Sequence, residues 1–257
     1  MPWPVPAIAA AGVFYFLGGR QSVHRDWRRD ASFYAGLAVL IAAIDSPIDW
    51  AADKHFWVHM TQHVLLMMVA PPLLLLGRPW PRMIRPLPRG VRLPLARSVL
   101  VGATLGPLRG LGRRLASPLP AFVLFSVNLL AWHVPALYDL TLRNGTVHEL
   151  EHTLFVGTAL LFWVHLLPST RPQLSDAWRV AYGTGGVLVS WILAIVLGIA
   201  AHPLYSYPSL ADQQVAAGIM WVPGSVPFCV ALGFAVFRWL DPAPRRRRPI
   251  VLRPRET

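Results

Sequence analysis

The chain alternates long apolar runs with short arginine-rich segments, and this alternation restricts it to a membrane-embedded helical fold. A helix needs about 20 apolar residues to cross the hydrocarbon core of a bilayer, within a range of roughly 17 to 25. Runs of about this length cover residues 3–19, 31–47, 57–77, 118–134, 150–167, 180–201 and 213–240. We therefore predict an all-α polytopic membrane protein whose seven transmembrane helices form one domain over residues 1–240.

The composition supports a membrane protein and argues against a nucleic-acid-binding one. Hydrophobic residues make up 54% of the chain and charged residues 14%, whereas a soluble domain carries about 25% charged residues. The net charge of +12 could suggest nucleic acid as a partner. However, the basic residues lie between apolar runs, where membrane insertion requires them. We expect the lipid bilayer, and no nucleic acid, as a partner.

The basic residues fall almost entirely in one of the two alternating sets of connecting segments. Residues 20–30, 78–117, 168–179 and 238–257 hold 22 of the 24 basic residues, and the opposite set holds only Lys54 and Arg143. Because cytoplasmic segments carry the excess of Lys and Arg, we predict an outside N-terminus and a cytoplasmic C-terminus. The first apolar run starts at Trp3 without a preceding basic residue, so we expect no cleavable signal peptide.

Several segments of the chain depart from simple spanning helices. The mixture of Arg and apolar residues over 78–117 predicts an amphipathic helix at the inner surface, and residues 241–257 are predicted to form a basic cytoplasmic tail. The third run contains Pro71 and Pro72, and the seventh contains Pro223 and Pro227. We expect kinks or breaks at these prolines.

Seven of the nine histidines fall at the end of the predicted helices that faces outward. They are His55, His59, His63, His133, His148, His152 and His202. An imidazole in or near a bilayer is costly to desolvate, so such residues often mark a functional site. Their convergence on one face from four segments indicates a metal or haem site.

The spacing of the histidines strengthens this interpretation. His55, His59 and His63 follow each other at intervals of four residues, which predicts one helix face with His63 deepest. His148 and His152 form a second pair with the same spacing. A single histidine at a helix end, as at His55 alone, is more often an interfacial or capping residue. The single cysteine, Cys229, excludes a thiolate pair as metal ligand.

The segment from His148 to His152 also fits the zinc-protease signature H-E-x-x-H, in which two histidines bind zinc and Glu149 would activate water. No protease-type third-ligand motif follows it in the sequence. We keep a membrane metalloprotease that uses His148, Glu149 and His152 as a lesser alternative.

Three groups of motifs resemble a known family. The first is HMTQHVLL (59–66) with APPLL (70–74) and GRP (77–79). The second is WHVPALY (132–138) with VH (147–148), EH (151–152) and FW (162–163). The third is DQQ (212–214) with MWVPG (220–224). These motifs resemble the seven-helix CtaG family of bacterial cytochrome c oxidase assembly factors. The resemblance implies a multi-pass protein of the bacterial plasma membrane, without enzymatic activity, that acts on subunits of a haem-copper terminal oxidase.

Copper is the metal that this resemblance implies, and imidazole and thioether groups suit it. The hypothesis assigns three sets of residues. The metal ligands are His59, His63, His133, His148 and His152; the auxiliary ligands are Met60, Met67, His55 and His202; and Glu151 or Asp212 would orient a ligating imidazole. Two alternatives remain: a haem held axially by His63 and His152, and a structural assembly scaffold with merely interfacial histidines. In the copper hypothesis, transfer to the oxidase needs exposed ligands near the surface.

Overall fold

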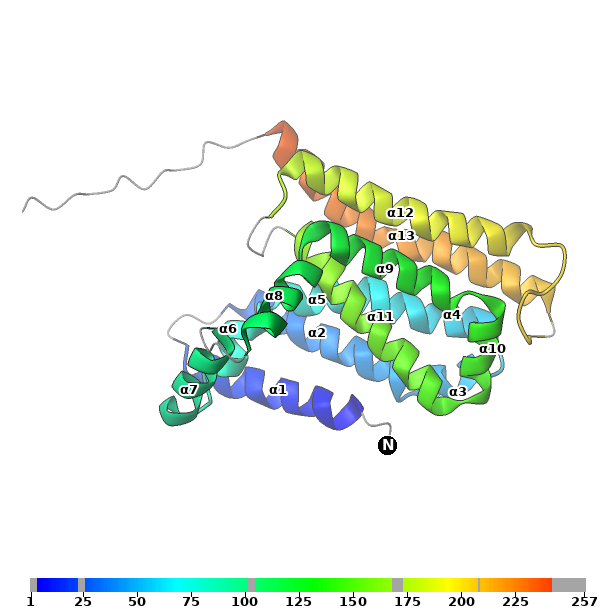
Figure 1. Ribbon diagram of the computed structural model, residues 1–257. Coiled ribbons are helices and arrows are strands. Elements are labelled where there is room, and N and C mark those ends of the chain that lie inside the picture. Colours follow the sequence, from blue (N-terminus) through cyan, green and yellow to red (C-terminus); the bar gives the residue numbers. More distant parts are fainter. Residues whose placement is uncertain (1–3, 23–25, 101–104, 168–172, 208, 242–257) are drawn as a thin grey trace, which may run out of the picture.

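The computed structural model describes residues 4–22, 26–100, 105–167, 173–207 and 209–241, and over these ranges the chain is helical without strands (Figure 1). The elements are α1 (Pro4–Arg20), α2 (Trp27–Ile44), α3 (Pro47–Ala52), α4 (Phe56–Val64), η1 (Leu65–Val69), α5 (Ala70–Leu76), α6 (Pro79–Ile84), α7 (Arg89–Leu100), α8 (Gly106–Leu115), α9 (Pro118–Trp132), α10 (Pro135–Arg143), α11 (Gly145–Leu166), α12 (Asp176–Ile199) and α13 (Leu210–Leu240). Each of the seven apolar runs lies on a helix or on the continuous segment α4–η1–α5. The all-α class is confirmed.

Three helical segments within the described ranges are long and apolar enough to cross a membrane on their own. They are Phe56–Leu76, which joins α4, η1 and α5, and the helices α12 and α13. The helices α8 and α9 meet the same criteria together, although they are bent by 71° at their junction. The chain is thus a membrane protein by length and composition. The count of seven spans and their orientation stay predictions.

The connecting segments sort to the two ends of the helical bundle (Figure 1). The helices α6, α7 and α8 lie at one end, where α1 ends and α9 begins. The short helices α3 and α10 and the connection between α12 and α13 lie at the other end. The described helices of the arginine-rich segment 78–117 therefore lie at the end of the molecule opposite to α3 and α10.

The expected break at Pro71 and Pro72 takes the form of a π-helical turn. A proline has no N–H group and clashes with the carbonyl four residues earlier, which widens the preceding turn. In η1 the Ala70 N–H donates to the Leu65 carbonyl, one residue farther back than in an α-helix. The carbonyl of Met67 loses its normal partner at Pro71, and it accepts instead from the indole Nε1 of Trp163, at 2.9 Å. The segment stays continuous because another helix satisfies the freed carbonyl.

The other expected special segments have mixed outcomes. Helix α13 passes through Pro223 and Pro227 as one 31-residue helix, so it is not broken there. Within 78–117, α8 leaves Leu108 and Leu111 exposed beside its arginines and buries none of its residues, which is the pattern of a helix lying at a surface. The predicted basic tail lies beyond residue 241, outside the described residues.

Helix α11 lies at the centre of the larger hydrophobic core. Its Phe162 is fully buried and stacks with Phe125 of α9 and Tyr182 of α12, with ring centroids 4.4 and 4.6 Å apart. Its neighbour Trp163 bonds to η1, as described above. The bond of Trp163 holds α11 against the segment α4–η1–α5, so the histidines in the N-terminal parts of α4 and α11 are brought together.

Candidate metal centre

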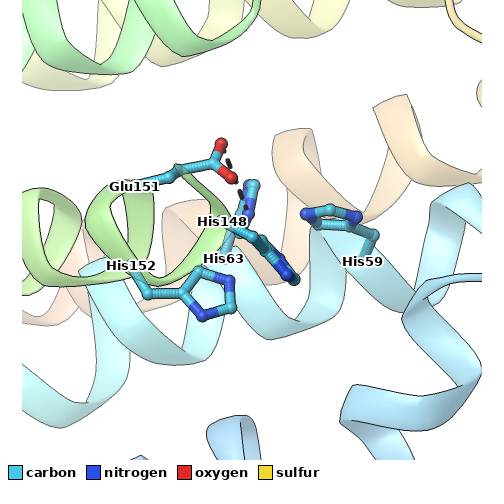
Figure 2. Close-up of side chains that lie close together, drawn as sticks. All are labelled: His59, His63, His148, Glu151 and His152. Atoms are coloured by element: carbon cyan, nitrogen blue, oxygen red, sulfur yellow. Dashed lines mark ion pairs between the residues drawn. The ribbon is translucent and has the colours of Figure 1, made fainter. Parts of the chain in front are cut away.

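Four histidines and one glutamate converge between the N-terminal parts of α4 and α11 (Figure 2). They are His59, His63, His148, Glu151 and His152, and each offers one donor atom such that all five atoms lie within 4.8 Å of one another. We call this set the His–Glu cluster. A metal ion bound by imidazole nitrogens at about 2.0–2.1 Å in tetrahedral geometry separates neighbouring ligand atoms by about 3.3–3.4 Å, so modest side-chain rotations would close this set around one ion.

The capping of α4 decides which histidines face the cluster. The carboxylate of Asp212 accepts hydrogen bonds from the backbone N–H groups of Phe56 and Trp57, both at 2.9 Å. The helix therefore begins at Phe56, and His55 has an extended backbone and an exposed side chain. The expectation that His55, His59 and His63 share one helix face is wrong for His55, because this residue precedes the helix.

A tyrosine fixes the orientation of His59. The hydroxyl of Tyr207 donates to the Ala52 carbonyl at 2.7 Å and lies 3.1 Å from Nδ1 of His59. Burial raises the pKa of Tyr207, so the hydroxyl stays protonated. It uses its one hydrogen in the bond to the Ala52 carbonyl. It must then accept from His59, which places a hydrogen on Nδ1 and a lone pair on Nε2. This buried Nε2 has no hydrogen-bond partner among the described residues and is free to bind a cation.

His63 and Glu151 form the most enclosed part of the cluster. Glu151 is fully buried and His63 is 4% exposed, and His63 Nε2 lies 3.7 Å from Glu151 Oε1 (Figure 2). Both ring nitrogens of His63 and both carboxylate oxygens lack hydrogen-bond partners within the described chain. A buried carboxylate without a partner is costly, and a bound cation would offset that cost.

His148 and His152 complete the cluster from one face of α11. Their Nε2 atoms are buried and without a partner in the described ranges. The ring centroids of His59 and His148 are 5.0 Å apart, and those of His63 and His152 are 5.6 Å apart. His152 is buried, whereas His148 is half-buried. Among the five residues, His148 therefore lies nearest to the molecular surface.

The remaining residues of the hypothesis lie elsewhere. His133 is buried but turned aside: its Nδ1 lies 2.8 Å from the Leu129 carbonyl and its Nε2 lies 3.4 Å from Sδ of Met60. Met67 is buried in η1. His202 is exposed at the end of α12. Asp212 uses both oxygens to cap α4, so it positions a helix and orients no imidazole, whereas Glu151 belongs to the cluster itself.

The loop between α12 and α13 contributes residues that we did not predict from the sequence. The Tyr205 hydroxyl donates to the His133 carbonyl at 2.9 Å, and Tyr207 supports His59. The rings of both tyrosines pack on the buried Phe56. The aromatic pair in Tyr205-Ser206-Tyr207, just after His202, was the available signal, but nothing in the sequence shows that this loop folds back over α4.

Gln62 is a further residue that the sequence did not mark as functional. Its fully buried amide donates to the Ala43 carbonyl at 2.7 Å and to Asp49 at 2.8 Å. Burial raises the pKa of Asp49, although the bond from Gln62 partly opposes this. Gln62 thereby ties α4 to α2 and α3 and fixes the rotation of the helix that carries His59 and His63.

The donor set of the cluster fits a transition-metal ion. Imidazole suits zinc, copper, iron and nickel, while sites for magnesium and calcium are built from oxygen ligands. Each ligand must be deprotonated at the binding atom, and the bond to Tyr207 provides that form for His59. The cluster can therefore hold an ion through nitrogen and one carboxylate oxygen.

Comparison with known proteins gives a family and two distant relatives. The family model "Cytochrome c oxidase caa3 assembly factor (Caa3_CtaG)" matches residues 13–241. An uncharacterized protein of Mycobacterium bovis and one of Mycobacterium tuberculosis are each 27% identical to the chain over 261 residues. The alignments cover 90% of this chain and 38% of each relative, so the chain spans little more than a third of their length. No solved structure matches.

Proposed function

The chain belongs to the family of cytochrome c oxidase caa3 assembly factors, and on that premise we propose that it binds copper near the outer membrane face and passes it to an oxidase subunit. The observation that carries this proposal is the His–Glu cluster, in which buried nitrogen and oxygen donors converge without hydrogen-bond partners in the described ranges. Such atoms are costly to bury unless something binds them. A metal ion would bind one such atom from each of the five residues at once.

Copper fits both the donor set of the cluster and the oxidase that the family assembles. A haem-copper oxidase needs copper for its own centres. Among the divalent first-row ions, Cu²⁺ binds nitrogen and oxygen sites most tightly. One ionised carboxylate, from Glu151, would offset part of the charge of the ion in the buried site.

The charge of the outer end supports entry of a cation from that side. The predicted outer segments carry seven of the twelve acidic residues and only two of the basic ones. The acidic residues are Asp45, Asp49, Asp53, Asp139, Glu149, Glu151 and Asp212. A face of one sign attracts the opposite ion and raises its local concentration. The chain is thus locally acidic at the site although its net charge is +12.

Buried ligands change how transfer must occur. The hypothesis from sequence expected exposed ligands, but the cluster is buried apart from the half-buried His148. The carboxylates of Asp49 and Asp53 act electrostatically on His148, so they lie on the side where an ion would arrive or leave. We propose that His148 exchanges the ion with the oxidase subunit while the deeper ligands retain it between encounters.

The compact geometry favours a single ion over haem. A haem held by His63 and His152 would need room for a porphyrin between the two rings. The ring centroids of His59 and His63 are only 4.4 Å apart, and His59 lies 6.5 Å from His152. The third imidazole thus occupies the space that the macrocycle would need.

The arrangement of the glutamates supports the hydrolase alternative less well than a copper site. In H-E-x-x-H enzymes the glutamate next to the first histidine activates water at the metal. Here Glu149 is not among the converging donors, and the carboxylate that lies beside the imidazoles is that of Glu151. The family membership likewise suggests a non-catalytic role.

Metal analysis of the full-length protein purified in mild detergent tests the proposal. We expect about one copper ion per chain at the cluster in the wild type and its loss in His152→Ala and Glu151→Gln. The matched control is His202→Ala, which removes an exposed histidine from the same end of the molecule and should keep its copper. If the wild type binds no copper, or if His152→Ala binds as much as His202→Ala, the protein acts as a scaffold and the proposal fails.

A further inference from the structure

A small cavity beside the His–Glu cluster is lined by sulfur. It has a volume of about 20 Å³, enough for one water-sized particle. Its walls include His63, His133 and four of the six methionines of the chain: Met60, Met67, Met68 and Met220. These methionines come from α4, η1 and α13, so the tertiary structure and not one sequence motif brings the thioethers together.

The hydrogen bond of His133 to the Leu129 carbonyl decides which of its ring nitrogens carries a lone pair. Its Nδ1 lies 2.8 Å from the carbonyl oxygen of Leu129. A carbonyl only accepts, so Nδ1 carries the hydrogen. Burial disfavours the charged imidazolium, and the neutral ring then has a lone pair on Nε2.

This lone pair meets a second electron-pair donor. Nε2 of His133 lies 3.4 Å from Sδ of Met60, and the two side chains are 5% and 0% exposed. In the neutral tautomer no hydrogen lies between the two atoms, so the contact is no hydrogen bond. A nitrogen and a thioether sulfur that face each other at this distance have the spacing of two neighbouring ligands of one tetrahedral metal ion, whose bonds to nitrogen and sulfur are about 2.0 and 2.3 Å long.

We propose that His133 and Met60 form a second metal site, which takes a soft monovalent ion such as Cu(I), with Met67 and Met220 as further thioether donors. Thioether sulfur selects Cu(I), whereas the imidazole and carboxylate donors of the His–Glu cluster also suit harder ions. The two sites share His63, whose ring nitrogens both lack partners among the described residues. A monovalent copper ion would pass between them by ligand exchange on that imidazole without a change of oxidation state, because imidazole also suits Cu(I). The assignment of the ion as copper rests on the proposed function, but the soft site itself does not.

Two probe ions separate the sites in the full-length protein in detergent. Ag(I) is a soft monovalent ion without accessible redox chemistry, and Zn(II) reports on the His–Glu cluster. The test variant is Met60→Leu, since Met and Leu exchange in cores at a cost of usually less than about 1.5 kcal/mol. The matched control is Met83→Leu, in α6 and outside the cavity lining. X-ray absorption of the Ag(I)-loaded protein reports sulfur ligation directly.

We expect sulfur scattering around Ag(I) in the wild type and in Met83→Leu, and a lower number of sulfur ligands in Met60→Leu. Losing even an outer-shell partner of a metal lowers affinity roughly 10-fold to 100-fold, so Ag(I) affinity should fall at least about 10-fold. Zn(II) affinity should stay within about twofold, which also shows that the variant is folded. The inference is overturned if Met60→Leu keeps the full sulfur signal of the wild type, if it loses Zn(II) as well, or if the wild type binds no Ag(I) through sulfur. A wild type that binds Ag(I) through sulfur but no copper at the cluster would refute only the proposed function.

Discussion

Replacing Tyr207 by Phe tests whether the loop between α12 and α13 prepares His59 for metal binding. The hydroxyl donates to the Ala52 carbonyl at 2.7 Å and accepts from His59 Nδ1 at 3.1 Å. The side chain is 6% exposed, so water does not readily replace the lost partner. The substitution keeps the ring that packs on Phe56 and removes only these two bonds.

The magnitude follows from the two contacts. Leaving a buried donor or acceptor unsatisfied costs about 1–3 kcal/mol, which we expect to appear as reduced thermal stability. Without the tyrosine, His59 can also place its hydrogen on Nε2, the atom that should bind the ion. Loss of such a supporting partner lowers metal affinity roughly 10-fold to 100-fold, which equals about 1.4–2.8 kcal/mol of binding free energy.

The assay is competitive copper titration of detergent-purified protein, together with thermal unfolding of the metal-free form. The control is Tyr205→Phe in the same loop, where the side chain is equally buried and the hydroxyl donates to the His133 carbonyl at 2.9 Å. Both variants should lose stability, but only Tyr207→Phe should lose copper affinity at the His–Glu cluster. Equal copper affinities in the two variants would refute the positioning role of Tyr207.

Three further predictions concern the ligands and the topology. His63→Ala should lose bound copper, and cells that carry it should lose oxidase activity at limiting copper. The variant should still accumulate, because the ring nitrogens of His63 make no hydrogen bond to a described protein group. The exposed control His55→Ala should lose much less copper and activity, and full metal content in the His63 variant would contradict the site. Glu149→Gln should lower terminal oxidase activity only slightly, whereas His152→Ala should lower it severely. Equal and complete loss of this activity in both variants would support the hydrolase alternative instead. Reporters fused to the C-terminal end and inserted before α11 should report opposite sides of the membrane, and an outside signal at the C-terminal end would reverse the orientation.

The sequence predicted the secondary structure and part of the site because both depend on local periodicity. Apolar runs of about 20 residues form helices wherever the backbone must satisfy its own hydrogen bonds, and each predicted run lies on a helix. The spacing of four residues likewise predicted that His59 and His63, and His148 and His152, would each share a helix face. Both pairs are in the cluster. These features need no knowledge of what packs against the helix.

The tertiary structure decided which donors meet, because that depends on caps and contacts between segments far apart in the chain. Asp212 starts α4 after His55 and so removes that histidine from the site, while Glu151 points inward and joins it. His133 is a buried histidine like those of the cluster. Its bond to the Leu129 carbonyl nevertheless orients its other ring nitrogen toward Met60. Local spacing sets the face of a helix, but the rotation of one helix against another follows from long-range packing, so only the fold could divide the predicted ligands between the His–Glu cluster and the cavity.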